Sequence, residues 1–106
     1  MSARPHDDVM AELLRDDPVV AAELLNSVLA EGDQAELMVT LRQLAKAFGG
    51  VRPVAEEAHL NPTQLYRALS EPGNPKLSNL RAILRVMGLR LAVQPIESPE
   101  ARLRGL

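Results

Sequence analysis

Polar side chains that can read the edge of a DNA base pair cluster in the stretch from 61 to 67. Thr63, Gln64 and Arg67 follow an Asn-Pro pair that predicts the start of a short helix. Gln pairs with adenine, Arg pairs with guanine, and Thr offers a hydroxyl or a contact to the thymine methyl group. Side chains near the N-terminus of a helix reach base edges when that helix enters the major groove. These three positions therefore predict a DNA-reading edge.

Other polar residues nearby suit the phosphate backbone better than the bases. Tyr66 offers a phenol, and the predicted start of the next helix offers free backbone amides. The complete set of predicted DNA-binding residues is Arg52, Asn61, Pro62, Thr63, Gln64, Tyr66, Arg67, Lys76, Ser78 and Asn79. Structural roles would explain two of them equally well, with Ser78 as a helix cap and Tyr66 as a half-buried packing residue.

Two short helices joined by a tight turn would position these side chains. The first is predicted over residues 52–58 and the second over 62–70, with His59 to Asn61 interrupting the helical pattern. Asn61 is a candidate N-cap and Pro62 would occupy the first helical position. The shared apolar underside is predicted to consist of Val54, Leu60, Leu65 and Leu69. This spacing is typical of a helix-turn-helix.

The rest of the domain is predicted to be helical, because apolar residues recur at the spacing of one helix face. The further helices are expected over residues 8–15, 18–31, 34–47 and 78–87, and the last of them could also begin at Lys76-Leu77. Asp17 and Asp33 supply start signals, and Gly88 supplies a stop signal. The apolar residues expected at helical spacing include Val9, Met10, Leu13, Leu14, Leu24, Leu25, Leu29, Leu37, Val39, Leu41, Leu44, Ile83, Leu84 and Met87.

A short alternating segment follows the last predicted helix. Leu89, Leu91 and Val93 would lie on one side of a strand, opposite Arg90 and Ala92, and a proline ends the run at position 95. A lone strand needs a partner from outside the chain, and the simplest partner is the same strand of a second copy. The segment Leu89–Val93 thus predicts a homodimer. The alternative is an extended tail that lies on the core.

Composition restricts the chain to a small helical domain. With 106 residues and 2% aromatic content, it must build one modest core from aliphatic side chains, which suits packed helices. The absence of cysteine excludes disulfides and thiolate metal sites. No apolar run of about 18 residues or signal peptide is present, which predicts a cytoplasmic protein without membrane contact. Residues 1–7 and 96–106 are expected to be flexible ends of a single domain, 8–95.

Charge is distributed unevenly along the sequence. Residues 1–36 carry two arginines against nine acidic residues, whereas residues 37–106 carry ten basic against five acidic residues. An acidic front and a basic back predict two surfaces with different partners, although uneven solvated charge would give the same pattern. No catalytic triad, metal-ligand spacing or phosphate-binding loop is present, so we expect no enzyme, no metal site and no cofactor.

The span from residue 16 to 95 resembles the HigA-like antitoxins, also called addiction-module antidote proteins. The run LYRALSEPGNPKLSNL is its most specific part, and the resemblance covers about three quarters of the chain. It implies an all-α, lambda-repressor-like helix-turn-helix bundle of five to six helices with one short C-terminal β-strand. Two residues depart from the family pattern: His59 stands where glycine is usual, and Pro62 stands where a polar residue is usual. At His59 this predicts a positive φ, which costs more conformational energy for histidine than for glycine.

The resemblance also implies a function with two partners. One is a RelE-like mRNA-endonuclease toxin that the antitoxin neutralises, and the other is operator DNA, through which the antitoxin represses its own operon. The implied reading positions are Thr63, Gln64 and Arg67. Two alternatives stay open: a protein-interaction module that has lost DNA binding, favoured by the net charge of −2 and by His59, and a stand-alone phage-type repressor.

Overall fold

A computed structural model describes residues 6–70 and 72–96, and all regular secondary structure in these residues is helical. Within them, six helices follow one another along the chain. They are α1 (His6–Asp16), α2 (Pro18–Glu31), α3 (Gln34–Ala47), α4 (Val51–Glu57), α5 (Pro62–Ala68) and α6 (Leu77–Val86). The predicted order of helices is confirmed, and every helix end lies within two residues of its predicted position. No helix in these ranges is both long and apolar enough to cross a membrane.

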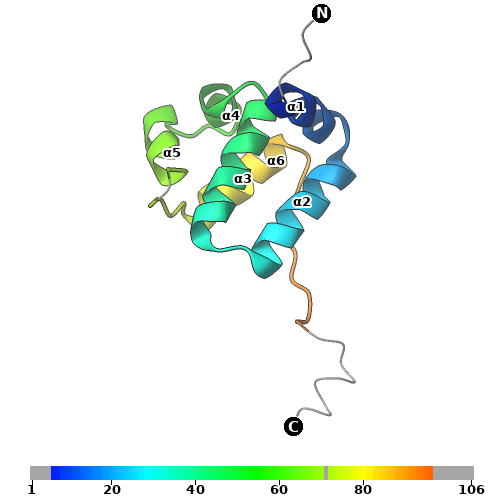
Figure 1. Ribbon diagram of the computed structural model, residues 1–106. Coiled ribbons are helices and arrows are strands. Elements are labelled where there is room, and N and C mark those ends of the chain that lie inside the picture. The colour runs from blue at the N-terminus through cyan, green and yellow to red at the C-terminus, as the bar shows by residue number, and fades with distance from the viewer. Residues whose placement is uncertain (1–5, 71, 97–106) are drawn as a thin grey trace, which may run out of the picture.

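Helix α3 forms the centre of the bundle. It packs against α1, α2 and α4, while α4 also packs against α5 and α6. Figure 1 shows α1 and α2 on one side of α3, α4 and α5 on the other, and α6 behind. Met38, Leu41 and Leu44 of α3 are completely buried, so the core is aliphatic as its composition predicts. Among the described residues, neither α4 nor α5 contacts α1 or α2.

Three of the predicted helix starts are capped by the side chains that the sequence indicates. Asp17 accepts a hydrogen bond from the Val19 N–H at 3.0 Å, and Asp33 accepts one from the Glu36 N–H at 2.8 Å. Asn61 accepts one from the Gln64 N–H at 3.0 Å, at the start of α5. Each cap satisfies an amide that has no partner inside its helix. By contrast, Ser78 is no cap, because α6 already begins at Leu77 and its N-cap residue is Lys76.

Some expected core positions are exposed instead. Val9 and Leu13 of α1 are 48% and 46% exposed, whereas their neighbour Leu14 is buried and Met10 is half-buried. Leu29 of α2 and Val39 of α3 are also exposed. Two adjacent apolar stripes on a short helix satisfy the same periodicity, and the packing of α1 on α3 selects one of them. Of the four apolar residues predicted in α1, the structure therefore places Leu14 and Met10 against the core and leaves Val9 and Leu13 exposed.

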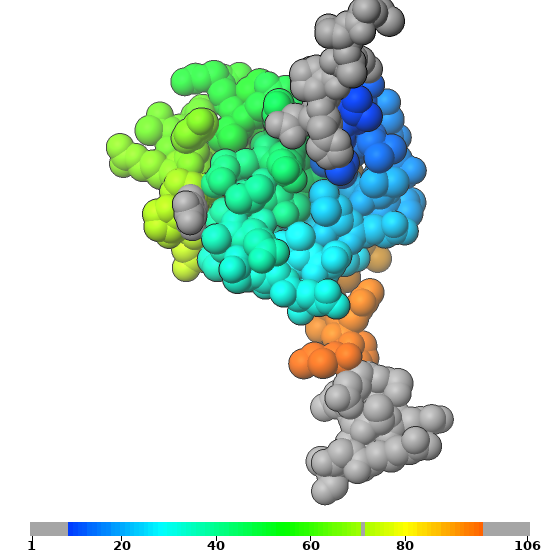
Figure 2. Space-filling view, in the orientation of Figure 1, coloured from blue at the N-terminus to red at the C-terminus, as the bar shows by residue number. Residues whose placement is uncertain are grey.

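The strand expected over residues 89–93 is not formed in this single chain. The Leu89 N–H donates to the Leu84 carbonyl at 2.8 Å and closes α6, and the following residues up to 96 have no regular secondary structure. Leu89 and Leu91 are half-buried against the body, while Val93 is fully exposed. Figure 2 shows this segment, in orange, standing out below α2. A strand exists only when it is paired, and the described residues supply no partner.

Candidate nucleic-acid interface

The α4–α5 pair has the apolar underside that the sequence predicts. Val54, Leu65 and Leu69 are each at most 2% exposed, and Leu60 packs against the same core from the turn. Ala55 of α4 is also completely buried. These contacts fix one side of α5 to the body. Its other side must therefore face outward.

The turn between α4 and α5 depends on a left-handed residue. His59 has φ of 60°, and its N–H donates to the Glu56 carbonyl at 3.1 Å, while the Leu60 N–H donates to the Ala55 carbonyl at 2.8 Å. This pair of hydrogen bonds is the Schellman motif, in which glycine usually takes the left-handed position. The ends of α3 and α6 use the same bonds with glycines at positions 49 and 88. The positive φ expected at His59 is confirmed.

We expect His59→Gly to raise the free energy of unfolding by about 0.5–1 kcal/mol, because glycine adopts this φ without a steric penalty. Urea unfolding followed by circular dichroism measures the change. His59→Ala is the control, since alanine keeps the penalty and should give no gain. A gain in both variants would mean that the imidazole, and not the backbone, destabilises the turn.

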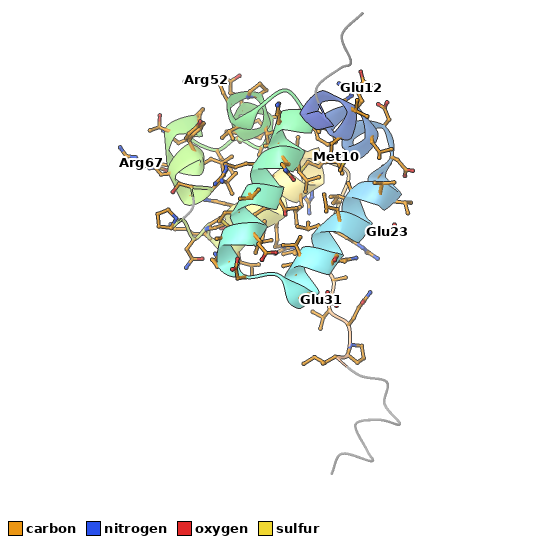
Figure 3. All side chains as sticks on the ribbon, viewed as in Figure 1. Met10, Glu12, Glu23, Glu31, Arg52 and Arg67 are labelled. Carbon is orange, nitrogen blue, oxygen red and sulfur yellow. The ribbon has the colours of Figure 1, made fainter. Side chains whose placement is uncertain are left out.

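The outward side of α5 carries the predicted reading residues. Thr63, Gln64 and Arg67 are all exposed, and Tyr66 is 66% exposed. Figure 3 shows the Arg67 side chain extending from α5 away from the body. Tyr66 is therefore too exposed to be the half-buried packing residue of the alternative interpretation. Pro62 is half-buried at the first position of the helix, where its missing N–H costs nothing.

The other predicted contacts are less uniform. Arg52 lies on α4, where its Nη1 atom is 3.7 Å from Oε1 of Glu56, and both side chains are well exposed. An exposed pair of this kind is weak, so the guanidinium can exchange its partner for a phosphate. Lys76 and Ser78 are exposed at the start of α6, while Asn79 is half-buried. The structure thus leaves Arg52, Lys76 and Ser78 accessible, and Asn79 only in part.

Two residues that the sequence did not indicate hold the end of α5 in place. The Nη1 atom of Arg42 on α3 donates to the carbonyl of Leu69, the C-cap residue of α5. Gln34, at the other end of α3, donates to the Gly73 carbonyl at 3.3 Å. A Cβ atom at Gly73 would lie 2.1 Å from the Ala68 carbonyl oxygen, so only glycine fits in this close approach. Helix α3 thereby positions α5 and the loop that follows it.

We expect Arg42→Met to lower the free energy of unfolding by about 1–2 kcal/mol, because a half-buried carbonyl loses a charged donor. Methionine keeps most of the apolar length of the side chain, so the change isolates the hydrogen bond. Gln43→Met, at the exposed neighbouring position, is the control and should have little effect. Equal losses in the two variants, measured by urea unfolding, would contradict a supporting role for Arg42.

Acidic side chains gather on the opposite side of α3. Asp16, Glu23 and Glu31 are exposed on α1 and α2. Figure 3 shows Glu12, Glu23 and Glu31 along these two helices, away from Arg52 and Arg67. Within the described residues, no three carboxylate or histidine side chains come together as a metal site. Glu56 and Glu57 are also exposed, on α4, and Arg15 is exposed on α1, so the folded surface separates the two signs of charge only in part.

These features define a small helical protein with one acidic side and one exposed polar helix. The model of a protein family described as "Probable addiction module antidote protein" matches residues 6–95. The chain belongs to this family, and it is accordingly an antitoxin whose partner is the toxin of the module. Comparisons with curated proteins and with solved structures give no match.

Proposed function

We propose that this antitoxin neutralises a RelE-like mRNA-endonuclease toxin and represses its own operon by binding DNA through α5. In this proposal α4 and α5 are a helix-turn-helix, and α5 is its recognition helix. The observation that carries the proposal is the two-sided character of α5. Leu65 is buried beneath it, while Thr63, Gln64 and Arg67 are exposed and face away from the core. A helix of this kind can enter a major groove without unfolding any part of the body.

The charge distribution supports two separate partners. The exposed carboxylates of α1 and α2 suit a basic protein, as a ribonuclease that binds RNA phosphates is expected to be. The basic half of the chain suits DNA phosphates, and most of its arginines are exposed. Helix-turn-helix repressors bind two half-sites as a dimer, so we include a homodimer formed through Leu89–Val93 in the proposal.

A gel shift with the DNA upstream of the protein's own gene tests the DNA-binding part. We expect a complex at low salt whose affinity falls steeply as salt rises, because phosphate contacts release counterions. Unrelated DNA of equal length is the control and should bind more weakly. No shift even at low salt would favour the alternative, a protein-interaction module that has lost DNA binding.

Co-expression with the adjacent small open reading frame tests the toxin-binding part. We expect the two proteins to copurify and the antitoxin to restore growth that the toxin arrests. RNA cleavage by the purified toxin, which the antitoxin should block, identifies the endonuclease class. A specific gel shift without any toxic neighbour would instead favour a stand-alone repressor.

A further inference from the structure

We propose that the groove between α2 and the segment 89–96 is a self-association site. In it, the segments of two copies pair as antiparallel strands centred on Ala92. This inference rests on the homodimer included in the proposed function, and it specifies the surface and the register. It does not depend on whether the protein binds DNA.

The groove is a feature of the described surface. It has an open volume of about 750 Å³, and its apolar walls are Leu25 and Leu29 of α2 together with Leu84, Leu89 and Leu91. Leu29 is 48% exposed at its edge. Val93 lies in the same segment without lining the groove, and it is 99% exposed. Burying an aliphatic side chain stabilises an interface, and the single chain leaves this stabilisation unused.

The backbone beside the groove is a free strand edge. Among the described residues, no backbone hydrogen bond involves residues 90–96 after the Leu89 N–H closes α6. Leu89 and Leu91 are half-buried and Arg90 and Ala92 are exposed, so residues 89–92 show the alternation of an extended strand. Such an edge can pair with an identical edge about a two-fold axis, which yields a closed dimer. In such a dimer, each copy would supply the groove for the other copy and the Val93 side chain that the other copy covers.

Proline and charge restrict the register without fixing it. Antiparallel pairing about Leu91 or Val93 as a non-hydrogen-bonded pair would also accommodate Pro95, and the pairing that we propose is the one about Ala92. Pro95 cannot donate a hydrogen bond, so it must occupy a non-hydrogen-bonded position of an antiparallel ladder. Pairing about Ala92 satisfies this condition, with Ala92 opposite its own copy and Arg90 opposite Gln94 as hydrogen-bonded pairs. Parallel pairing in register would instead place Arg90 against itself, which is unfavourable. The antiparallel register also sets Val93 opposite Leu91 of the second copy, on the side of the α2 groove.

Single cysteines test the register, because the natural chain contains none. In the proposed pairing, the two copies of position 92 are about 5.5 Å apart between Cα atoms, within reach of a disulfide. The two copies of position 90 are about 13 Å apart along the strands, beyond that reach. We expect oxidation to convert Ala92→Cys into a disulfide-linked dimer and to leave Arg90→Cys monomeric on a denaturing gel. Equal or greater linkage of Arg90→Cys would overturn the register.

Matched substitutions test the groove itself. Leu29→Asp, at 48% exposure in the groove, should raise the dimer dissociation constant at least about tenfold in sedimentation equilibrium. Leu13→Asp, at 46% exposure on α1, should leave it unchanged. Val93→Asp and Val19→Asp form a second matched pair of exposed valines. Circular dichroism checks that each variant is folded.

Two results would overturn the proposal outright. One is a natural chain that stays monomeric at hundreds of micromolar, and the other is equal weakening by the groove and control variants. Protection of the segment only in the presence of the toxin would assign the groove to that partner instead. A dimer that forms as described but gives no gel shift would uphold this inference and contradict the DNA-binding proposal.

Discussion

The double substitution Gln64→Ala and Arg67→Ala is expected to lower the affinity for the operator DNA by about 10²- to 10⁴-fold. Each of these side chains can form a bidentate contact to one base, and such a contact discriminates by about 1–3 kcal/mol. Both residues are exposed on α5, so their truncation removes no core contact and the protein should stay folded. Fluorescence anisotropy with the upstream DNA and a scrambled sequence measures both affinity and specificity.

A matched control comes from the same residue types elsewhere on the surface. Gln43 on α3 and Arg15 on α1 are also exposed, and α1 makes no contact with α5. The variant Gln43→Ala with Arg15→Ala loses the same charge and the same amide, and we expect its DNA affinity to change less than about threefold. If the two double variants lose equal affinity, net charge and not α5 governs binding. If the α5 variant keeps its specificity, another element reads the DNA.

The second large effect is expected for Leu69→Ala, which should lower the free energy of unfolding by about 2–5 kcal/mol. Leu69 is completely buried at the C-cap of α5, beneath the proposed recognition helix. Truncation removes apolar contacts and leaves a cavity that the surrounding helices fill only in part. For a domain of this size, the loss is a large fraction of the total stability. Urea unfolding of purified protein measures it directly.

Leu77→Ala is the control for this prediction. Leu77 is 65% exposed at the start of α6, so the same loss of side-chain volume should cost less than about 0.5 kcal/mol. Comparable losses at the two positions would show that Leu69 is not part of the core in solution. The comparison also indicates whether the underside of α5 holds the helix in the position that DNA binding would need.

Local features of the structure were predictable from the sequence. The caps at Asp17, Asp33 and Asn61 act on amides two or three residues away, so residue type and spacing are enough to place them. The left-handed turn at His59 follows from the family resemblance, because His59 stands where glycine is usual. The buried underside of α4 and α5 follows from the spacing of their leucines. Together these features place Thr63, Gln64 and Arg67 on an exposed edge.

Features that join distant parts of the chain were decided only by the tertiary structure. Periodicity allowed two faces of α1, and packing on α3 selected the one with Leu14 over the one with Val9 and Leu13. The hydrogen bond from Arg42 to Leu69 joins residues 27 positions apart, so no local sequence pattern predicts it. The strand at 89–93 failed to form because pairing requires a second edge. Short-range hydrogen bonds and helix periodicity depend on neighbouring residues, so the sequence determines them. The burial of a side chain and the pairing of a strand depend on which distant parts of the molecule pack against them, so only the tertiary structure decides them.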